Sequence, residues 1–152
     1  MPTIRLETLI NADIQTCFDL SRSVDLHLES TKHTGETVIA GRTSGLIEFG
    51  ETVTWRARHF GIRQTLTSKI TVMQPPFLFV DEMLRGAFKS FRHEHHFNQL
   101  KGATLMTDIF IFEAPLGLLG AIANRLFLTS YMRDLLIKRN GMIKAHAESI
   151  AQ

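Results

Sequence analysis

Residues 50–72, GETVTWRARHFGIRQTLTSKITV, decide the fold. Apolar and polar side chains alternate along this stretch, a period of two that is typical of β-strands with one buried face. His59-Phe60-Gly61 interrupts the alternation and predicts the tip of a hairpin between two antiparallel strands. The inward face of the hairpin is expected to consist of Val53, Trp55, Ala57, His59, Ile62, Gln64, Leu66, Ser68, Ile70 and Val72.

The same period extends over residues 36–113, with glycine or proline at the turns. Three further strands are expected at about 77–85, 88–99 and 104–113, which together with the hairpin form an antiparallel meander. Residues 3–10 also alternate and predict a first strand.

Two short helices are expected between the first strand and the meander. Asp13 is a typical helix N-cap, and the apolar spacing after it predicts a helix that starts at Ile14. A second apolar set from Val24 onward predicts another short helix before Gly35.

After Pro115 the period changes to 3.6 and continues to about Ala147, which predicts one long helix. Some 30 residues at about 1.5 Å each reach about 45 Å, enough to cross the sheet. Its inward stripe is expected to be Leu118, Ile122, Leu126, Thr129, Met132, Leu136, Ile143 and Ala147. The basic residues Arg125, Arg133, Lys138, Arg139 and Lys144 are expected to avoid that stripe. The predicted class is α+β: a curved antiparallel sheet of about six or seven strands wrapped around a long C-terminal helix.

Composition favours one globular domain over residues 1–152, because the chain has 152 residues of which 44% are hydrophobic and 21% charged. Lys and Arg number 17 against 15 Asp and Glu, a net charge of +2. This excess is too small for a dedicated nucleic-acid binder, so we expect no nucleic-acid partner.

The sequence also predicts a cytoplasmic protein. Cys17 is the single cysteine, so no intrachain disulfide is possible. Arg5 and Glu7 lie where a secretory signal needs an unbroken apolar run. The longest apolar segment, 110–132, is interrupted by charged residues, so we expect no stable membrane insertion.

Four segments, in this order, resemble the SRPBCC superfamily: GETVTWRARHFG (50–61), PP-F-x-FVDEM (75–83), FRHEHHF (91–97) and PLGLLGAIANRLFLTSYMRDLLIKRN (115–140). The superfamily includes START lipid-transfer domains, birch-pollen-allergen relatives and aromatic polyketide cyclases. The resemblance implies a helix-grip fold with a cavity between the curved sheet and the last helix. It is strongest toward bacterial single-domain members described as cyclase/dehydrase-like, and it leaves the activity open because one fold hosts many functions.

Ionisable residues interrupt the inward faces of three adjacent predicted strands. Strand parity predicts that Asp81, Arg85, His93, His95 and Asp108 point inward and meet. Burying such groups costs several kcal/mol per ion unless partners compensate. Two interpretations remain open: a salt-bridge network that fixes strand register, or a polar patch that orients a ligand's carboxylate, hydroxyl or keto oxygen.

Catalysis is a more specific form of the interpretation as a polar patch that orients a ligand. His93 or His95, oriented by Asp108, would act as general acid or base, and Arg85 would stabilise an enolate oxygen during ring closure or dehydration. The related cyclases make this alternative reasonable.

A metal site is a further alternative, because His93-x-His95 on a strand places both imidazoles on one face, with His59 or Asp108 as a third ligand. The positions three and four residues beyond His95 carry amides where a cupin-like site needs Glu. We therefore expect neither a metal nor a cofactor.

The leading hypothesis is a domain that binds a small hydrophobic or amphipathic molecule, lipid-like or polyketide-like, with a cyclase or dehydratase as the alternative. A structural or partner-binding module is a third class, and a homo-oligomer is left open. Glycines within 116–123 suggest either an entrance or close helix packing. The ligand-binding residues are expected to be Trp55, His59, Gln64, Phe79, Asp81, Met83, Phe91, Met106, Phe110, Ile122, Leu126 and Met132.

Overall fold

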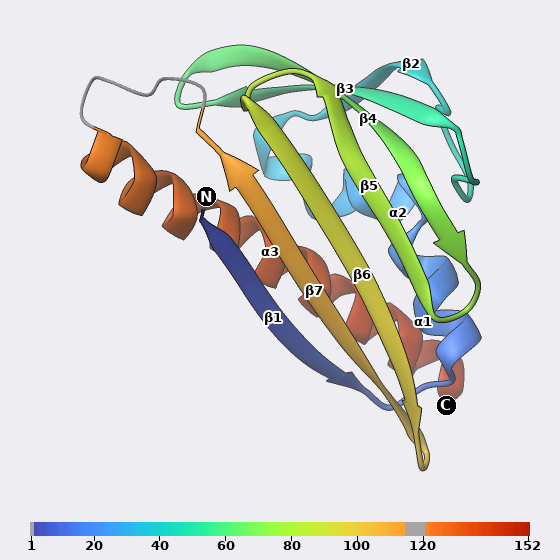
Figure 1. The fold of residues 1–152 in the computed structure, drawn as a ribbon. Helices are drawn as coiled ribbons and strands as arrows, with labels where there is room; N and C mark the ends of the chain where they lie inside the picture. Colours follow the sequence, from blue (N-terminus) through green and yellow to red (C-terminus); the bar gives the residue numbers. More distant parts are fainter. Residues whose placement is uncertain (1, 115–120) are drawn as a thin grey trace.

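A seven-stranded antiparallel sheet curls around one long helix (Figure 1). The computed structural model describes residues 2–114 and 121–152, and its side chains up to 114 and from 126 onward. The strand order is β1-β7-β6-β5-β4-β3-β2. Neighbouring strands are consecutive in sequence except for β1 and β7. The strands are β1 (Thr3–Ile10), β2 (Thr37–Gly41), β3 (Thr52–His59), β4 (Ile62–Gln74), β5 (Leu78–Arg85), β6 (Ser90–Leu100) and β7 (Ala103–Glu113).

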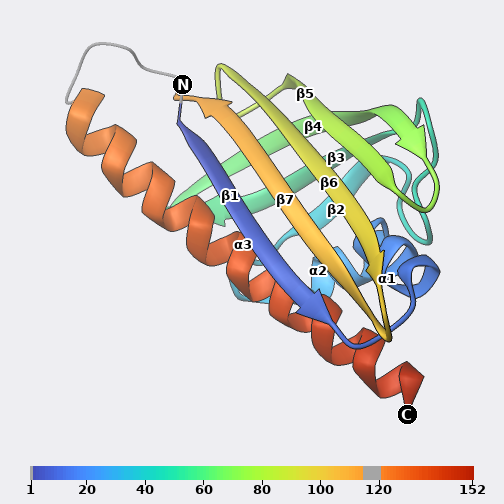
Figure 2. The same cartoon turned by 60° about the horizontal axis from the view of Figure 1, so that its bottom comes forward.

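The helices cover the concave face of the sheet. The helix α3 (Ala121–Ala151) crosses it diagonally, and α1 (Ile14–Ser21) and α2 (Val24–Ser30) lie beside its C-terminal half (Figure 2). Asp13 caps α1 by accepting the Thr16 amide hydrogen, as the sequence predicts, and a one-turn 3₁₀ helix, η1 (Lys32–Thr34), follows α2. None of the described helices is long and apolar enough to cross a membrane.

The apolar interior has two parts. The larger part packs α1 and α2 against the sheet and the C-terminal half of α3, around Phe18, Met106 and Ile143, which are each at most 1% exposed. The smaller part surrounds Phe110 and Phe112. Burial of this kind contributes roughly 25 cal/mol per Å² of apolar area, which makes it the main source of stability.

The predicted order of elements is confirmed: first strand, two short helices, antiparallel meander and long helix. The long helix is described from Ala121 and ends at Ala151, four residues beyond the predicted end. The hairpin tip at Phe60 and Gly61 is also confirmed, and both residues have positive φ, 55° and 74°. Glycine adopts that conformation without strain, which suits it to a tight turn.

Two register shifts between β4 and β5 overturn predictions that rest on strict alternation. Ile70 lies opposite Asp81 but Val72 lies opposite Val80, so Thr71 is an extra residue. The bulge turns Val72 to the outer face and brings Met73 against the core in its place. The inward position predicted for Val72 is therefore wrong.

The second shift lies at the other end of β5. Ser68 is opposite Met83 and Thr67 is opposite Arg85, which leaves Leu84 unpaired. Thr67 faces outward, where its hydroxyl hydrogen-bonds Thr54. Arg85 shares that outer face and is exposed. The prediction that Arg85 points inward is therefore wrong, and the cause is a one-residue bulge that reverses side-chain direction.

Candidate functional site

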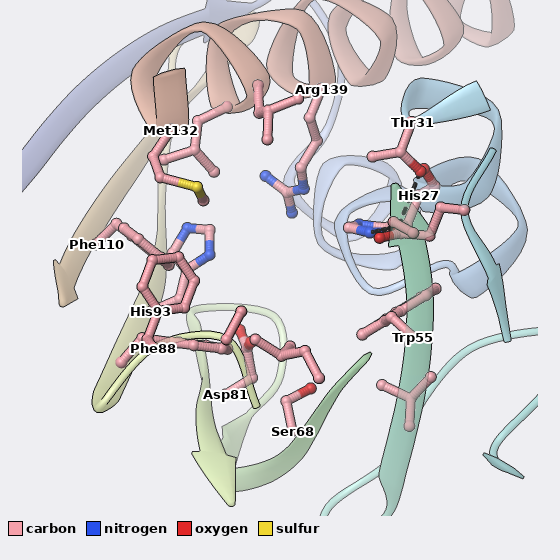
Figure 3. A pocket seen from close by; sticks show the side chains of 18 of the residues that line it. His27, Thr31, Trp55, Ser68, Asp81, Phe88, His93, Phe110, Met132 and Arg139 are labelled. Carbon is pink, nitrogen blue, oxygen red and sulfur yellow. Dashed lines mark hydrogen bonds and ion pairs between the residues drawn. The ribbon is translucent and has the colours of Figure 1, made fainter. Parts of the chain in front are cut away.

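A cavity of about 580 Å³ lies between the concave face of the sheet and α3. Its volume is within the range of about 300–1,000 Å³ that is common for small-molecule sites. Most of its wall is apolar, with Trp55 and Ile70 from the sheet facing Leu135 and Met132 from α3. Figure 3 shows the hollow, with Arg139 and Met132 reaching in from the helix and His93 and Trp55 on opposite sides.

The polar end of the cavity is formed by Asp81, His93, His95, Asp108 and Arg139, called here the deep cluster. The register places Asp81 opposite His93 and His95 opposite Asp108. The hydrogen bonds run diagonally: His93 Nε2 lies 2.8 Å from Asp108 Oδ1, and His95 Nε2 lies 2.8 Å from Asp81 Oδ1. Diagonal neighbours on adjacent strands are within reach of long side chains.

Asp108 is the most enclosed member of the deep cluster, with no exposed surface. Asn140 Nδ2 donates to its Oδ2 at 2.7 Å, and Arg139 Nη1 lies 3.4 Å from its Oδ1. Arg139 also donates through Nη1 to the Asn140 side-chain oxygen at 2.9 Å and through Nη2 to the Ser21 carbonyl at 3.1 Å. A buried carboxylate survives when charge and hydrogen bonds compensate its desolvation, and Asp108 has both.

The surroundings fix the charge states of the deep cluster. Burial opposes ionisation of Asp108, yet hydrogen bonds from His93 and His95 and the charge of Arg139 hold its pKa well below 3.8. Burial is likewise outweighed at Asp81, where the hydrogen bond from His95 lowers the pKa. Burial, followed by the proximity of His95, lowers the pKa of His93 to about 4, so its imidazole is neutral at pH 7.

The imidazole of His95 is held between two other rings. It stacks on Phe79 with ring centres 4.0 Å apart and lies 3.7 Å from the ring of His93. Its Nδ1 lies 3.3 Å from Arg139 Nη2. Packing and hydrogen bonding thus fix one orientation of this side chain.

A second polar group, the α2 cluster, consists of His27, Thr31 and Glu36 on the other side of the cavity (Figure 3). His27 Nε2 lies 2.6 Å from Glu36 Oε1, and the Thr31 hydroxyl donates to the same oxygen at 2.9 Å. Burial opposes ionisation of Glu36, but the His27 contact and the Thr31 hydrogen bond outweigh it and lower the pKa. The His27 ring lies 4.2 Å from that of Trp55.

Four aromatic side chains from the β3–β4 hairpin and α3, namely His59, Phe60, Phe127 and Tyr131, form an aromatic rim on the cavity. Phe60 lies 4.6 Å from Tyr131 and 5.2 Å from Phe127 between ring centres. His59 Nδ1 lies 2.5 Å from the Tyr131 hydroxyl. Phe60 and Phe127 remain more than half exposed, so this end of the cavity borders the surface.

The residues predicted for catalysis divide between three positions. His93 and His95 line the cavity. Asp108 lies behind them, where it contacts both imidazoles, and Arg85 is on the outer face. The inward meeting of Asp81, His93, His95 and Asp108 agrees with the prediction, while the arginine in the cluster is Arg139.

Most residues predicted to bind ligand line the cavity, namely Trp55, His59, Gln64, Phe79, Asp81, Phe91, Phe110 and Met132. Met106 is instead sealed in the core at 0% exposure, where the Ser21 hydroxyl lies 3.3 Å from its sulfur. Met83 packs against the smaller core, and Leu126 is 69% exposed on α3. The side chain of Ile122 and most of the segment 116–123 lie outside the described residues.

Ile62 pairs with His59 at the first position of β4 but is 62% exposed, so the predicted inward burial is not met there. The hairpin extends beyond the cover that the helices provide. Strand parity gives the side of the sheet and not the extent of the layer that packs on it.

Arg139 is the site residue that the sequence interpretation misplaced. It is 7% exposed, although a position outside the inward stripe of the long helix is predicted for it. Its spacing from Leu136 and Ile143, three and four residues, is itself the helical inward pattern, and the charge alone led to the outward placement. Glu36 and His27 are also site residues that the sequence does not indicate, because His27 lies within the seven-residue helix α2 and Glu36 immediately precedes the five-residue strand β2, and elements this short have no clear period.

Asp81, His93 and His95 are the described group with the geometry of a metal site, since one donor atom from each lies within 4.8 Å of the others. Two of these donors already bind each other, because His95 Nε2 contacts Asp81. The nearby Arg139 cation further disfavours a divalent ion. The donor set fits a metal less well than it fits the hydrogen bonds present.

No protein-family model and no curated protein match this sequence. Solved structures do match. One domain of the di-domain aromatase/cyclase StfQ, from the steffimycin biosynthetic pathway, has a TM-score of 0.78 at 14% identity, with 98% of this chain and 52% of that protein covered. A START superfamily protein from Mycobacterium smegmatis has a TM-score of 0.73 at 10% identity, with 97% and 98% covered.

The chain has a helix-grip fold, the fold that its resemblance to the SRPBCC superfamily implies. Ginseng major latex-like protein 151 from Panax ginseng shares it, with a TM-score of 0.68 at 19% identity over 96% of this chain and 97% of that protein. At such identities the likeness establishes the helix-grip fold alone, and neither a ligand nor individual site residues carry over.

Proposed function

We propose that this protein binds a small hydrophobic or amphipathic molecule in the cavity between the sheet and α3. The observation that carries the proposal is the cavity itself: about 580 Å³ of space with an apolar wall and ionisable groups at one end. A core built only for stability closes such space, because unfilled volume costs roughly 24 cal/mol per Å³. Helix-grip proteins typically bind hydrophobic ligands, which supports the same proposal.

The cyclase or dehydratase alternative depends on the same end of the cavity. His93 with Asp108 behind it has the arrangement of a general base and its orienting carboxylate. A base with a pKa of about 4 is nevertheless far from neutral pH, where proton abstraction is most effective. Binding is therefore the function that the site supports best.

Trp55 makes the proposal directly testable, since it is the single tryptophan of the chain and lines the cavity. We expect the neutral dye N-phenyl-1-naphthylamine to gain fluorescence on binding and to accept excitation energy from Trp55. Fatty alcohols and flat aromatic compounds should then displace the dye. Native mass spectrometry of the purified protein should show the corresponding one-to-one complexes.

A matched pair of variants controls for surface binding. Ala57 lines the cavity and is 5% exposed, so Ala57→Phe should fill part of the space and weaken dye binding at least tenfold. Ala40 is exposed on β2, so Ala40→Phe adds the same group outside and should leave binding unchanged. Equal effects of the two variants, or no dye binding by the native protein, would overturn the proposal.

A further inference from the structure

The two histidines of the deep cluster differ in how many of their ring atoms have partners. His95 uses both nitrogens: Nε2 faces Asp81 at 2.8 Å and Nδ1 faces Arg139 Nη2 at 3.3 Å. His93 uses Nε2 alone, against Asp108 at 2.8 Å. Among the described residues, nothing donates to or accepts from His93 Nδ1.

The protonation of His93 follows from its neighbour. Asp108 is ionised, so it accepts a hydrogen and His93 Nε2 is the atom that donates it. A neutral imidazole carries one hydrogen, which leaves Nδ1 with a bare lone pair. His93 is 6% exposed and lines the cavity, so this acceptor is reached from the cavity and not from open solvent.

We propose that the polar end of the ligand is a hydroxyl group that donates its hydrogen to Nδ1 of His93. This inference rests on the proposed function and narrows it, since it assigns the class of ligand: an apolar body that carries an alcohol or phenol. An incoming hydroxyl gives this acceptor a donor inside a mostly apolar cavity, and one such hydrogen bond contributes about 0.5–1.5 kcal/mol net.

A carboxylate ligand fits this end of the cavity poorly. A carboxylate has no hydrogen to donate, so its oxygen lone pairs would repel the lone pair of His93 Nδ1. Its negative charge would also lie near the ionised Asp81 and Asp108. Arg139 does not offset this, because Nη1 donates to Asn140 and Asp108 and Nη2 donates to Ser21 and faces His95. The remaining Nε–H is a single donor, which a hydroxyl oxygen accepts as well as a carboxylate does, whereas paired binding of a carboxylate needs two parallel donors.

A ketone also fails to complete the site, because a carbonyl oxygen only accepts hydrogen bonds. The other walls near His93 are apolar. Phe110 packs edge-on against its ring with centres 5.3 Å apart, and Phe88 and Met132 lie alongside (Figure 3). These walls suit the carbon skeleton next to the hydroxyl.

Matched naphthalene compounds separate these possibilities by displacement of N-phenyl-1-naphthylamine. 2-Naphthol should bind about three- to tenfold more tightly than 2-methylnaphthalene or 2-methoxynaphthalene, the gain of one hydrogen bond. 2-Naphthoate should bind more weakly than 2-naphthol. Equal affinities for all neutral compounds, or a preference for 2-naphthoate, would overturn the hydroxyl assignment while the binding function stands.

Variants connect the preference to one atom. His93→Phe should bring 2-naphthol and 2-methylnaphthalene to the same affinity. His96→Phe, on the outer face of the same strand, should leave the preference intact. If no naphthalene compound displaces the dye from the native protein, and native mass spectrometry finds no complex, the proposed function itself fails.

Nitrogen NMR of histidine-labelled native protein tests the same point without a substitution that risks unfolding. His93 Nδ1 should give the signal of an unprotonated nitrogen, and this signal should shift on addition of 2-naphthol but not of 2-methoxynaphthalene. A protonated Nδ1 in the native protein would refute the inference.

Discussion

The deep cluster and the α2 cluster both set a carboxylate against the Nε2 atom of a histidine, at 2.8 Å for Asp108 and 2.6 Å for Glu36. They differ in what else surrounds the carboxylate. Asp108 has Arg139 and Asn140 and no exposed surface. Glu36 has a hydroxyl, and its histidine is about one-third exposed. Asp108, with no exposed surface, therefore depends on a permanent cation, while Glu36, whose side chain is 9% exposed, is held by the His27 contact and the Thr31 hydroxyl.

The largest expected effect is the loss of that cation. Arg139→Met should lower the free energy of unfolding by about 3–5 kcal/mol, because it leaves Asp108 buried without its positive partner. Arg133 lies on the same helix and is exposed, so Arg133→Met should cost less than about 0.5 kcal/mol. Urea denaturation of both variants measures the difference. Similar stabilities would mean that the deep cluster does not depend on Arg139.

The next effect is a pH dependence that belongs to the deep cluster. The pKa of His93 is lowered from 6.5 to about 4, so between these values the unfolded chain binds a proton that folded His93 does not. The contribution of His93 to the free energy of unfolding is therefore fully present above pH 6.5 and is lost as the pH falls toward 4. At roughly 1.4 kcal/mol per pKa unit, the loss is about 3 kcal/mol.

His93→Gln isolates this contribution because glutamine does not titrate. The pKa of His59 is also lowered by burial, so the difference between native protein and variant is the quantity to measure from pH 7 to pH 4. Asp81 and Asp108 have pKa values below 3.8 and lose their contributions only at lower pH. Parallel stability curves for the two proteins would contradict the assignment.

Only part of the deep cluster could be predicted from the sequence. The fold and the inward position of Asp81, His93, His95 and Asp108 follow from strict alternation, which holds along β6 and β7 without interruption. The position of Arg85 does not follow, because nothing in a period of two announces a bulge. The register shift depends on how β4 and β5 pair in three dimensions.

Arg139 and Glu36 were missed for different physical reasons. Arg139 lies on the inward face of α3. A charge is acceptable there only because the side chain contacts Asp108 on β7, 31 residues earlier in the chain. Glu36 immediately precedes a short edge strand, β2, whose five residues carry almost no periodic signal. Pairing between distant segments decides the position of Arg139, whereas the partners of Glu36, His27 and Thr31, are only nine and five residues away and lie in elements too short to show a period.

A smaller effect is expected in the α2 cluster. Glu36→Gln removes the charge but keeps an acceptor oxygen for His27 and Thr31, so the loss should be about 1 kcal/mol. Glu29 lies on α2 with a side chain 54% exposed, and Glu29→Gln should change stability by less than about 0.5 kcal/mol. Thermal denaturation of the two variants is sufficient to compare them. A loss at Glu36 as large as that at Arg139 would remove the distinction between the clusters.

The smallest effect is expected for a substitution at Arg85. Arg85 and Arg139 are both candidates for the counter-charge of Asp108, and the bulge at Leu84 is what decides between them. Arg85 is exposed opposite Thr67, and no described residue pairs with it, so Arg85→Met should stay within about 0.5 kcal/mol of the native protein. The same substitution at Arg139 is expected to cost several times more, since a buried ion pair broken on one side leaves an uncompensated charge. If Arg85→Met were the damaging variant and Arg139→Met the mild one, β5 would lack its bulge, Arg85 would point into the cavity, and strict strand alternation would have given the right arginine.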